Sequence, residues 1–95
     1  MTRTIDIRPI GGGDPARFAV IIREGGSISR HEVTMSSQSF AKHADRAPEQ
    51  VIDAAFRFLL DREAKESILA RFDLSVISRY FPDFERELPR YLKAR

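Results

Sequence analysis

The two histidines, His31 and His43, are the residues best suited to metal or proton chemistry, because this 95-residue chain contains no cysteine. Twelve positions separate them, and we place His31 on a strand and His43 on a short helix. That spacing is not typical of metal-ligand motifs. We therefore predict no metal site and no cofactor, and we expect each histidine to face the core or to lie on the surface.

Other arrangements of potentially reactive residues do not match a catalytic pattern. The glycines at 11–13 resemble a phosphate-binding loop, but they lack its lysine–serine ending and precede Asp14 and Pro15 instead of a helix. No Gly-x-Ser-x-Gly motif occurs, and the carboxylates form no recognisable acid/base pair. We predict a hairpin connection at the glycines, no catalytic residue and a non-enzymatic function.

Charged side chains interrupt the apolar stretches of the second half of the chain. We expect them to present a polar surface to a protein partner, and the residues are Arg62, Glu63, Lys65, Glu66, Arg71, Asp73 and Arg79. The alternative is that these groups cap helices and pair with one another, with Arg71 and Asp73 locking a turn around Phe72. On the first interpretation the protein is a small interaction or regulatory module, and Arg62→Ala costs under about 0.5 kcal/mol as a surface change.

A nucleic-acid partner is the second hypothesis. Residues 66–81 resemble a helix-turn-helix, in which Ser75, Ser78 and Arg79 would expose polar groups. The last residues are locally basic, through Arg86, Arg90, Lys93 and Arg95. Four residues of the second helix are expected in the core, however, and the net charge is only +2, so this partner is less favoured.

Three strands are predicted in the first third of the chain. Ile5 and Ile7 alternate with polar residues, and Pro9 together with the run of residues 11–15 ends this strand. Residues 18–22 are apolar on both sides, as in a central strand. Gly25 and Gly26 indicate a tight hairpin, after which His31, Val33 and Met35 share one face of the returning strand. The result is an antiparallel meander that needs a cover on its apolar side.

Helices are predicted from residue 36 onward. Serines at 36, 37 and 39 cap a short helix through Ala44, and Pro48 opens the main core helix, with Phe56 at its centre. We expect a break within residues 61–67, and then a helix that includes Ile68, Leu69 and Phe72. Asp73 caps a further short helix that ends at Pro82. A final helix starts near Asp83 and bends at Pro89.

The predicted fold is α+β, with a three-stranded antiparallel meander packed against about four to five short helices. Residues 1–95 form one domain, strand-rich over 1–35 and helical over 36–95, and the 42% hydrophobic content is enough for a core. The sequence shows neither a signal peptide nor an apolar run long enough to span a membrane, so we expect a cytoplasmic protein without a membrane partner. Two open sheet edges favour a homodimer.

One segment resembles a known group of proteins. Residues 56–85, FRFLLDREAKESILARFDLSVISRYFPDFE, are similar to a segment shared by small uncharacterised bacterial proteins. Members of that group often have proline where this chain has Ala64, which favours a helix break at that point. The resemblance implies a small bacterial cytoplasmic protein, and it implies no activity, cofactor or catalytic residue.

Overall fold

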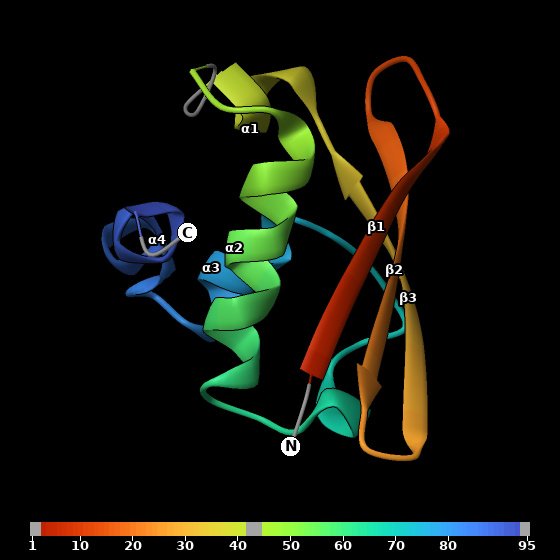
Figure 1. The fold of residues 1–95 in the computed structure, drawn as a ribbon. Helices are drawn as coiled ribbons and strands as arrows, with labels where there is room; N and C mark the ends of the chain where they lie inside the picture. The colour runs from red at the N-terminus through yellow and green to blue at the C-terminus, as the bar shows by residue number, and fades with distance from the viewer. Residues whose placement is uncertain (1–2, 42–44, 94–95) are drawn as a thin grey trace.

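The computed structural model describes residues 3–41 and 45–93, and it arranges the strands and helices in separate layers (Figure 1). One sheet contains four strands in the order β1 (Arg3–Gly11), β2 (Ala16–Glu24), β3 (Ser27–Met35) and β4 (Arg71–Asp73). The first three strands are antiparallel, as predicted, whereas β4 pairs with β3 in parallel. The α+β class is therefore confirmed, and the fourth strand was not expected.

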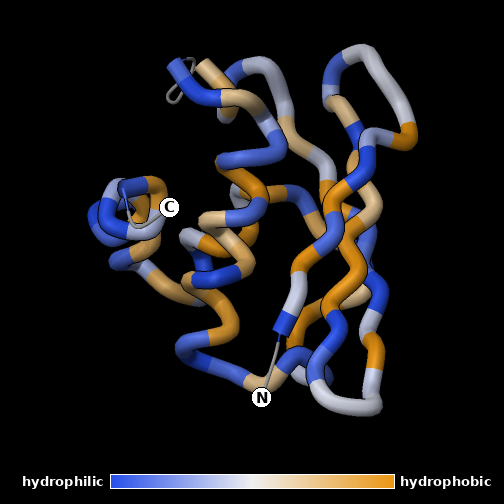
Figure 2. The backbone as a smooth tube through the Cα atoms, in the orientation of Figure 1, coloured by the Kyte–Doolittle hydropathy of each residue, from blue (hydrophilic) through white to orange (hydrophobic). Residues whose placement is uncertain are grey.

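Alternating side chains give the sheet one apolar face. Phe18, Val20 and Ile22 of β2 are buried, and the register places Val33 and His31 of β3 beside Phe18 and Val20. Figure 2 shows the resulting apolar stretches along the strands and along the helix that faces them. His31, Val33 and Met35 thus share the core face, as the period of two predicted.

The β2–β3 hairpin turns at the predicted glycines. Gly25 has φ of +59°, a conformation that residues with a Cβ atom rarely adopt. Strand β1 passes Pro9 with a register shift between Pro9 and Gly11, and it ends at Gly11, the first residue of the glycine run that was expected to end it. Since β1 is an edge strand, it tolerates the missing N–H of proline.

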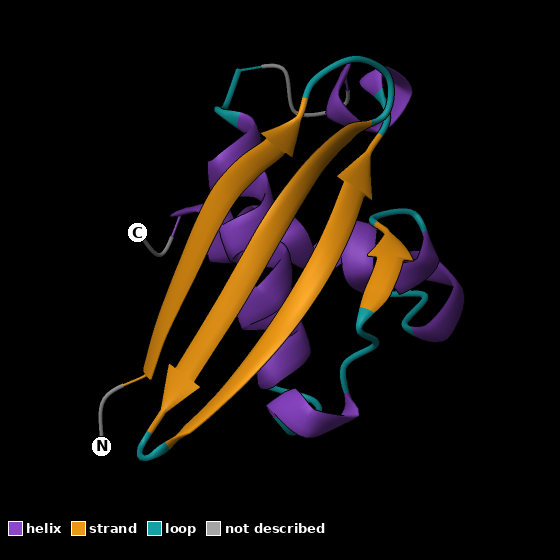
Figure 3. Cartoon of the chain, turned by 90° about the vertical axis from the view of Figure 1, so that its right-hand side faces the viewer, coloured by secondary structure: helices purple, strands orange, loops and turns teal. Residues whose placement is uncertain are grey.

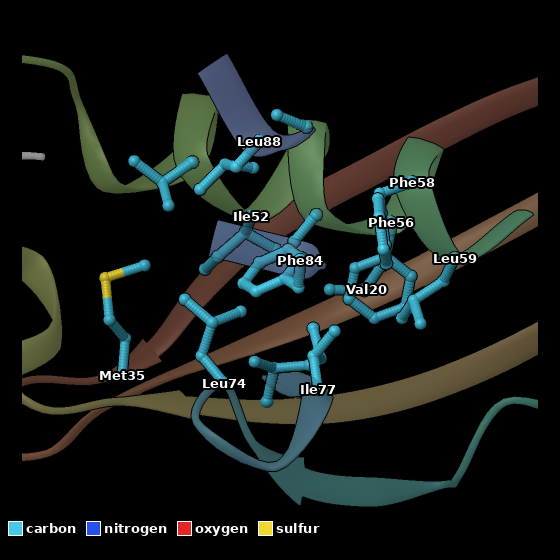
Figure 4. Packing of buried hydrophobic residues seen from close by; sticks show 14 of the residues in the cluster. Val20, Met35, Ile52, Phe56, Phe58, Leu59, Leu74, Ile77, Phe84 and Leu88 are labelled. Atoms are coloured by element: carbon cyan, nitrogen blue, oxygen red, sulfur yellow. The ribbon is translucent and has the colours of Figure 1, made fainter. Parts of the chain in front are cut away.

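Helices cover only one face of this sheet (Figure 3). The main helix, α2 (Pro48–Leu60), lies against the apolar face with Pro48 in its first turn, as predicted. Phe56 is fully buried, and its ring lies 5.8 Å from the ring of Phe72 on β4. Figure 4 shows Val20 from the sheet, Phe56 from α2 and Ile77 from α3 (Val76–Tyr80) gathered in this core.

A second helix layer packs on the other side of α2, away from the sheet. It is α4 (Phe84–Lys93), which buries Phe84, Leu88 and Leu92 and continues through Pro89 as one helix. Phe58 of α2 meets the ring of Phe84 edge-on at 5.1 Å between centroids. Helix α2 therefore has apolar residues on two sides, which explains why so much of it is buried.

The short helix α1 (Ser37–Ala41) follows β3. Ser36 caps it as expected, because its hydroxyl accepts a hydrogen bond from the backbone N–H of Ser39 at 3.1 Å. Asp14, at the β1–β2 turn, accepts bonds from the backbone and hydroxyl of Ser37, both 2.8 Å, and these hold the pKa of Asp14 below its ordinary value. His43 and Ala44 lie outside the described residues.

The predicted break after α2 is confirmed, but the predicted helix over Ile68 to Phe72 is wrong. Helix α2 ends at Leu60, and a 3₁₀ turn, η1 (Lys65–Ser67), leads into β4. Ala64 has φ of −68°, close to the value that the ring of proline imposes, so the backbone at this position would also accept a proline. Residues 66–81 are therefore a turn, a strand and a five-residue helix, not a helix-turn-helix.

No helix within residues 3–41 and 45–93 is long and apolar enough to cross a membrane. The two edges of the described sheet are β1 and β4, and β4 covers only residues 32–34 of β3. Because β1 leaves a nine-residue edge unpaired in one copy of the chain, the homodimer stays a prediction.

Candidate functional site

A pocket of about 450 Å³ opens where α2 ends and the chain turns into β4 and α3. Its volume lies within the range of pockets that hold small molecules or single side chains. Most of its walls are apolar, and the lining residues are Leu59, Glu63, Ser67, Ile68, Leu69, Phe72, Val76, Ile77, Tyr80 and Phe81. The pocket therefore depends on the loop between η1 and β4 keeping its position.

His31 fixes that loop to the sheet. Its Nδ1 atom lies 2.8 Å from the carbonyl oxygen of Leu69, and because a carbonyl only accepts, Nδ1–H is the donor. In the neutral ring Nε2 then accepts the hydroxyl hydrogen of Ser29 at 2.9 Å. The ring also packs against Phe56 at 5.6 Å between centroids. His31 is thus a buried structural tether between β3 and the pocket wall.

The apolar walls of the pocket are open to solvent at two large side chains. Leu69 is 48% exposed and Tyr80 is 68% exposed, so neither is covered by the rest of the described chain. Glu63 is half-buried at the pocket wall, and its carboxylate has no ion pair or hydrogen bond with any described residue. An apolar surface beside an unpaired carboxylate suits a ligand that combines an apolar group with a positive charge.

Arg62, a predicted partner residue, is engaged inside the molecule. Its guanidinium lies 3.7 Å from the centre of the Phe58 ring and donates to Asp83 at 3.2 Å. It also donates to the hydroxyl of Tyr91 at 3.4 Å, and that hydroxyl donates to Asp61 at 2.6 Å. The bond to Asp61, together with burial, raises the pKa of Tyr91. These contacts join the end of α2 to α4, and Arg62 is exposed, as expected, but has internal partners that the sequence did not indicate.

Lys65 and Glu66 form an ion pair within η1. Lys65 is only 3% exposed, which removes it from the predicted surface, whereas Glu66 remains exposed. The hydrogen bond from Lys65 lowers the pKa of the Glu66 carboxyl below its ordinary value. The interpretation that charged groups of this stretch pair with one another is confirmed for these two residues.

Asp73 and Arg71 lie on β4, on the face of the sheet that no helix covers. Asp73 accepts hydrogen bonds from the hydroxyl of Thr34 at 2.6 Å and from the backbone and hydroxyl of Ser75 at 3.1 and 2.7 Å. Burial raises its pKa, but the bonds from Thr34 and Ser75 outweigh this effect and hold the pKa below its ordinary value. Asp73 thus locks the turn into α3, while Arg71 has no ion pair with a described residue.

The seven predicted residues therefore do not form one surface. Glu63 lines the pocket, Arg79 lies exposed on α3, Arg71 and Asp73 belong to the sheet, and the other three have internal partners. The sequence reasoning missed Leu69 and Tyr80, because the helix expected around Leu69 and the core position expected for Tyr80 concealed their exposure.

Within the described residues, no group of three or more His, Asp or Glu side chains could hold a metal ion. Comparison with protein-family models, with curated proteins and with solved structures finds no match for this chain.

Proposed function

We propose that this protein is a non-enzymatic interaction module that binds a segment of a partner protein in the pocket between α2, β4 and α3. The observation that supports the proposal best is the pairing of an open apolar pocket with the unpaired carboxylate of Glu63. Leu69 and Tyr80 would provide contact area, and Glu63 would provide orientation. The partner segment would therefore present an apolar side chain next to a lysine or arginine.

The size of the pocket allows a side chain as the occupant. A pocket of about 450 Å³ accommodates one large apolar residue with part of its neighbours. The charge on Glu63 would select against segments with an acidic residue at that place, because like charges across an interface repel. Binding energy would come mainly from covering Leu69 and Tyr80, and specificity would come from Glu63.

Selection from a displayed library of random peptides tests this proposal. We expect the wild-type protein to enrich peptides that carry an apolar residue beside Lys or Arg. Glu63→Lys should enrich peptides with Asp or Glu in place of the basic residue. Glu49→Lys makes the same change at the opposite end of α2, and it should leave the wild-type preference intact.

The affinity of one selected peptide gives the second readout. Glu63→Lys should weaken it about tenfold or more, since it replaces attraction by repulsion, and Glu49→Lys should change it less than about twofold. Tyr80→Asp should also abolish binding by placing a charge beside the apolar wall. The proposal is wrong if the wild-type protein enriches no motif. It is also wrong if the wild type, Glu63→Lys and Glu49→Lys all enrich the same motif.

A further inference from the structure

The open face of the sheet carries an excess of positive charge. The pairing register places five arginines on this face, and they are Arg8, Arg17, Arg23, Arg30 and Arg71. Three carboxylates share it, from Asp6, Glu32 and Asp73. The excess of two positive charges equals the formal net charge of the whole chain, +2. The remaining charges of the chain therefore balance one another.

Three of these arginines have no partner among the residues that the structure describes. Arg23 forms an ion pair with Asp6 at 2.6 Å, and Arg17 lies 3.8 Å from Glu32. Arg8, Arg30 and Arg71 have no ion pair or hydrogen bond from their side chains to a described residue. All three are exposed, and no helix of the described chain lies over this face of the sheet (Figure 3). Their guanidinium groups are free to bind an external anion.

The distribution of the free arginines indicates a ligand with several negative charges. One continuous row crosses all four strands, from Arg8 through Ala19 and Glu32 to Arg71. Three strand spacings separate its ends, which is about 14 Å. One phosphate or carboxylate group cannot reach both ends, whereas a chain of phosphates can. Arginine also forms paired hydrogen bonds with phosphate oxygens, which lysine cannot do.

We propose that the open sheet face binds the phosphodiester backbone of a nucleic acid. This site is distinct from the pocket, because its residues lie on the opposite face of the sheet from Phe72 and the core. No aromatic side chain lies on the open face of the described strands, so the face offers no stacking platform for bases. Recognition therefore rests on phosphates and is independent of sequence. The twist of the sheet makes a planar membrane a poorer fit.

Fluorescence anisotropy with a labelled single-stranded DNA of about twenty nucleotides tests the proposal, with a duplex and an RNA of the same sequence as further probes. Three phosphate contacts predict a slope of about −2 for log affinity against log salt with a single strand. The affinity of the wild-type protein should therefore fall roughly 15- to 20-fold between about 50 and 200 mM salt. Whichever of the three probes binds tightest identifies the form of the backbone that fits the face.

Two variants with the same net charge separate the sheet face from general electrostatics. The triple change Arg8→Ala, Arg30→Ala and Arg71→Ala should weaken binding at least tenfold and bring the salt slope close to zero. The control changes Arg79, Arg86 and Arg90 to Ala on the exposed surface of α3 and α4, and it should keep most of the wild-type affinity. If circular dichroism shows that the triple variant is unfolded, two single variants replace the pair. Arg71→Glu changes the sheet face, and Arg79→Glu is its control on α3.

Three results would overturn the proposal. The first is an absence of binding to all three probes at the lower salt concentration. The second is an equal loss of affinity in both triple variants, which would indicate attraction by net charge alone. The third is binding of nucleic acid that is no tighter than retention on vesicles with anionic lipids at the same salt concentration, because the face would then recognise any polyanionic surface.

Discussion

Arg62 and Arg71 carry the same side chain but differ in what surrounds it. Arg62 lies at the contact between α2 and α4, where a ring, a carboxylate and a phenol engage its guanidinium. Arg71 lies on the open sheet face with a carboxylate, that of Glu32, on the neighbouring strand but no ion pair to it. The first arginine therefore stabilises the fold, while the second is available to a ligand.

This difference shows how the structure divides its many charges between stability and recognition. At the α2–α4 contact, the side chains of Arg62, Tyr91 and Asp83 are held together and partly screened from water, so their bonds hold the two helices together. On the sheet face, exposure weakens each ion pair, and the free arginines add little to the free energy of unfolding. The charge of an arginine does not show whether it stabilises the fold or is available to a ligand, whereas its partners in the structure do.

Phe56→Ala gives the largest expected effect and sets the scale for the others. The ring is fully buried between α2 and the sheet, and it contacts both His31 and Phe72. Its removal should lower the free energy of unfolding by about 3 to 5 kcal/mol, through lost burial and an unfilled cavity. Chemical denaturation measures this loss. If the variant is as stable as the wild type, Phe56 is not at the centre of the core.

Arg62→Ala should have the next largest effect. It removes a cation–π contact and the hydrogen bonds to Tyr91 and Asp83, and because Arg62 is partly exposed we expect a loss of about 1 to 2 kcal/mol. In a chain of this size, each kcal/mol lowers the melting temperature by about 4 to 8 °C. Arg79→Ala, on the exposed side of α3, is the matched control and should melt like the wild type. If both variants melt at the same temperature, the contacts of Arg62 at the α2–α4 contact add no more stability than an exposed arginine does.

Asp73→Ala should have a smaller effect that depends on pH. The carboxylate accepts bonds from Thr34 and Ser75 at the start of α3, and its loss should cost about 1 kcal/mol at neutral pH. Its pKa is lower in the folded protein than the ordinary 3.8, so the unfolded chain binds more protons as the solution becomes acidic. This stabilisation is therefore complete above that pH and is lost as the pH falls further.

Thermal melts of the wild type and Asp73→Ala across the acid range check this sign. The difference in melting temperature should stay constant at neutral pH and narrow as the pH falls below 3.8. A difference that widens in acid would mean that the protonated form of Asp73, and not the carboxylate, stabilises the turn.

The triple change of Arg8, Arg30 and Arg71 to alanine should have the smallest effect on stability. These side chains have no ion pair with described residues, so the three substitutions together should alter the free energy of unfolding by less than about 0.5 kcal/mol. Denaturation of this variant beside Arg62→Ala measures the contrast directly. A loss larger than that of Arg62→Ala would show that the sheet face depends on its arginines for stability.

Local patterns in the sequence were sufficient to predict the strands β1 to β3 and the helix α2. The strands are indicated by the alternation of apolar and polar residues and by the paired glycines at residues 25 and 26. The helix α2 is indicated by the apolar stripe around Phe56. Strand β4 has no such signal, because it contains three residues and its partner on β3 lies about forty positions earlier. Ile68, Leu69 and Phe72 suit a helix spacing equally well.

The candidate site was less predictable than the fold. Glu63 was included in the predicted surface because it is charged, but its place at a pocket wall depends on where α3 packs. The partners of Arg62 were not predicted, because Tyr91 on α4 and Asp83 just before it are placed by a packing that the local pattern does not specify. The arginines of the sheet face were individually visible, but only the register of four strands brings Arg8 and Arg71 into one row.

A titration of the ¹⁵N-labelled protein with single-stranded DNA, followed by its amide chemical shifts, tests the division between the two regions most directly. We predict that the largest shifts occur at the sheet-face row of Arg8, Ala19, Glu32 and Arg71. The amides of Phe58, Arg62 and Tyr91 should stay in place. Shifts that concentrate on α4 and the basic end of the chain, with an unchanged sheet face, would contradict the account.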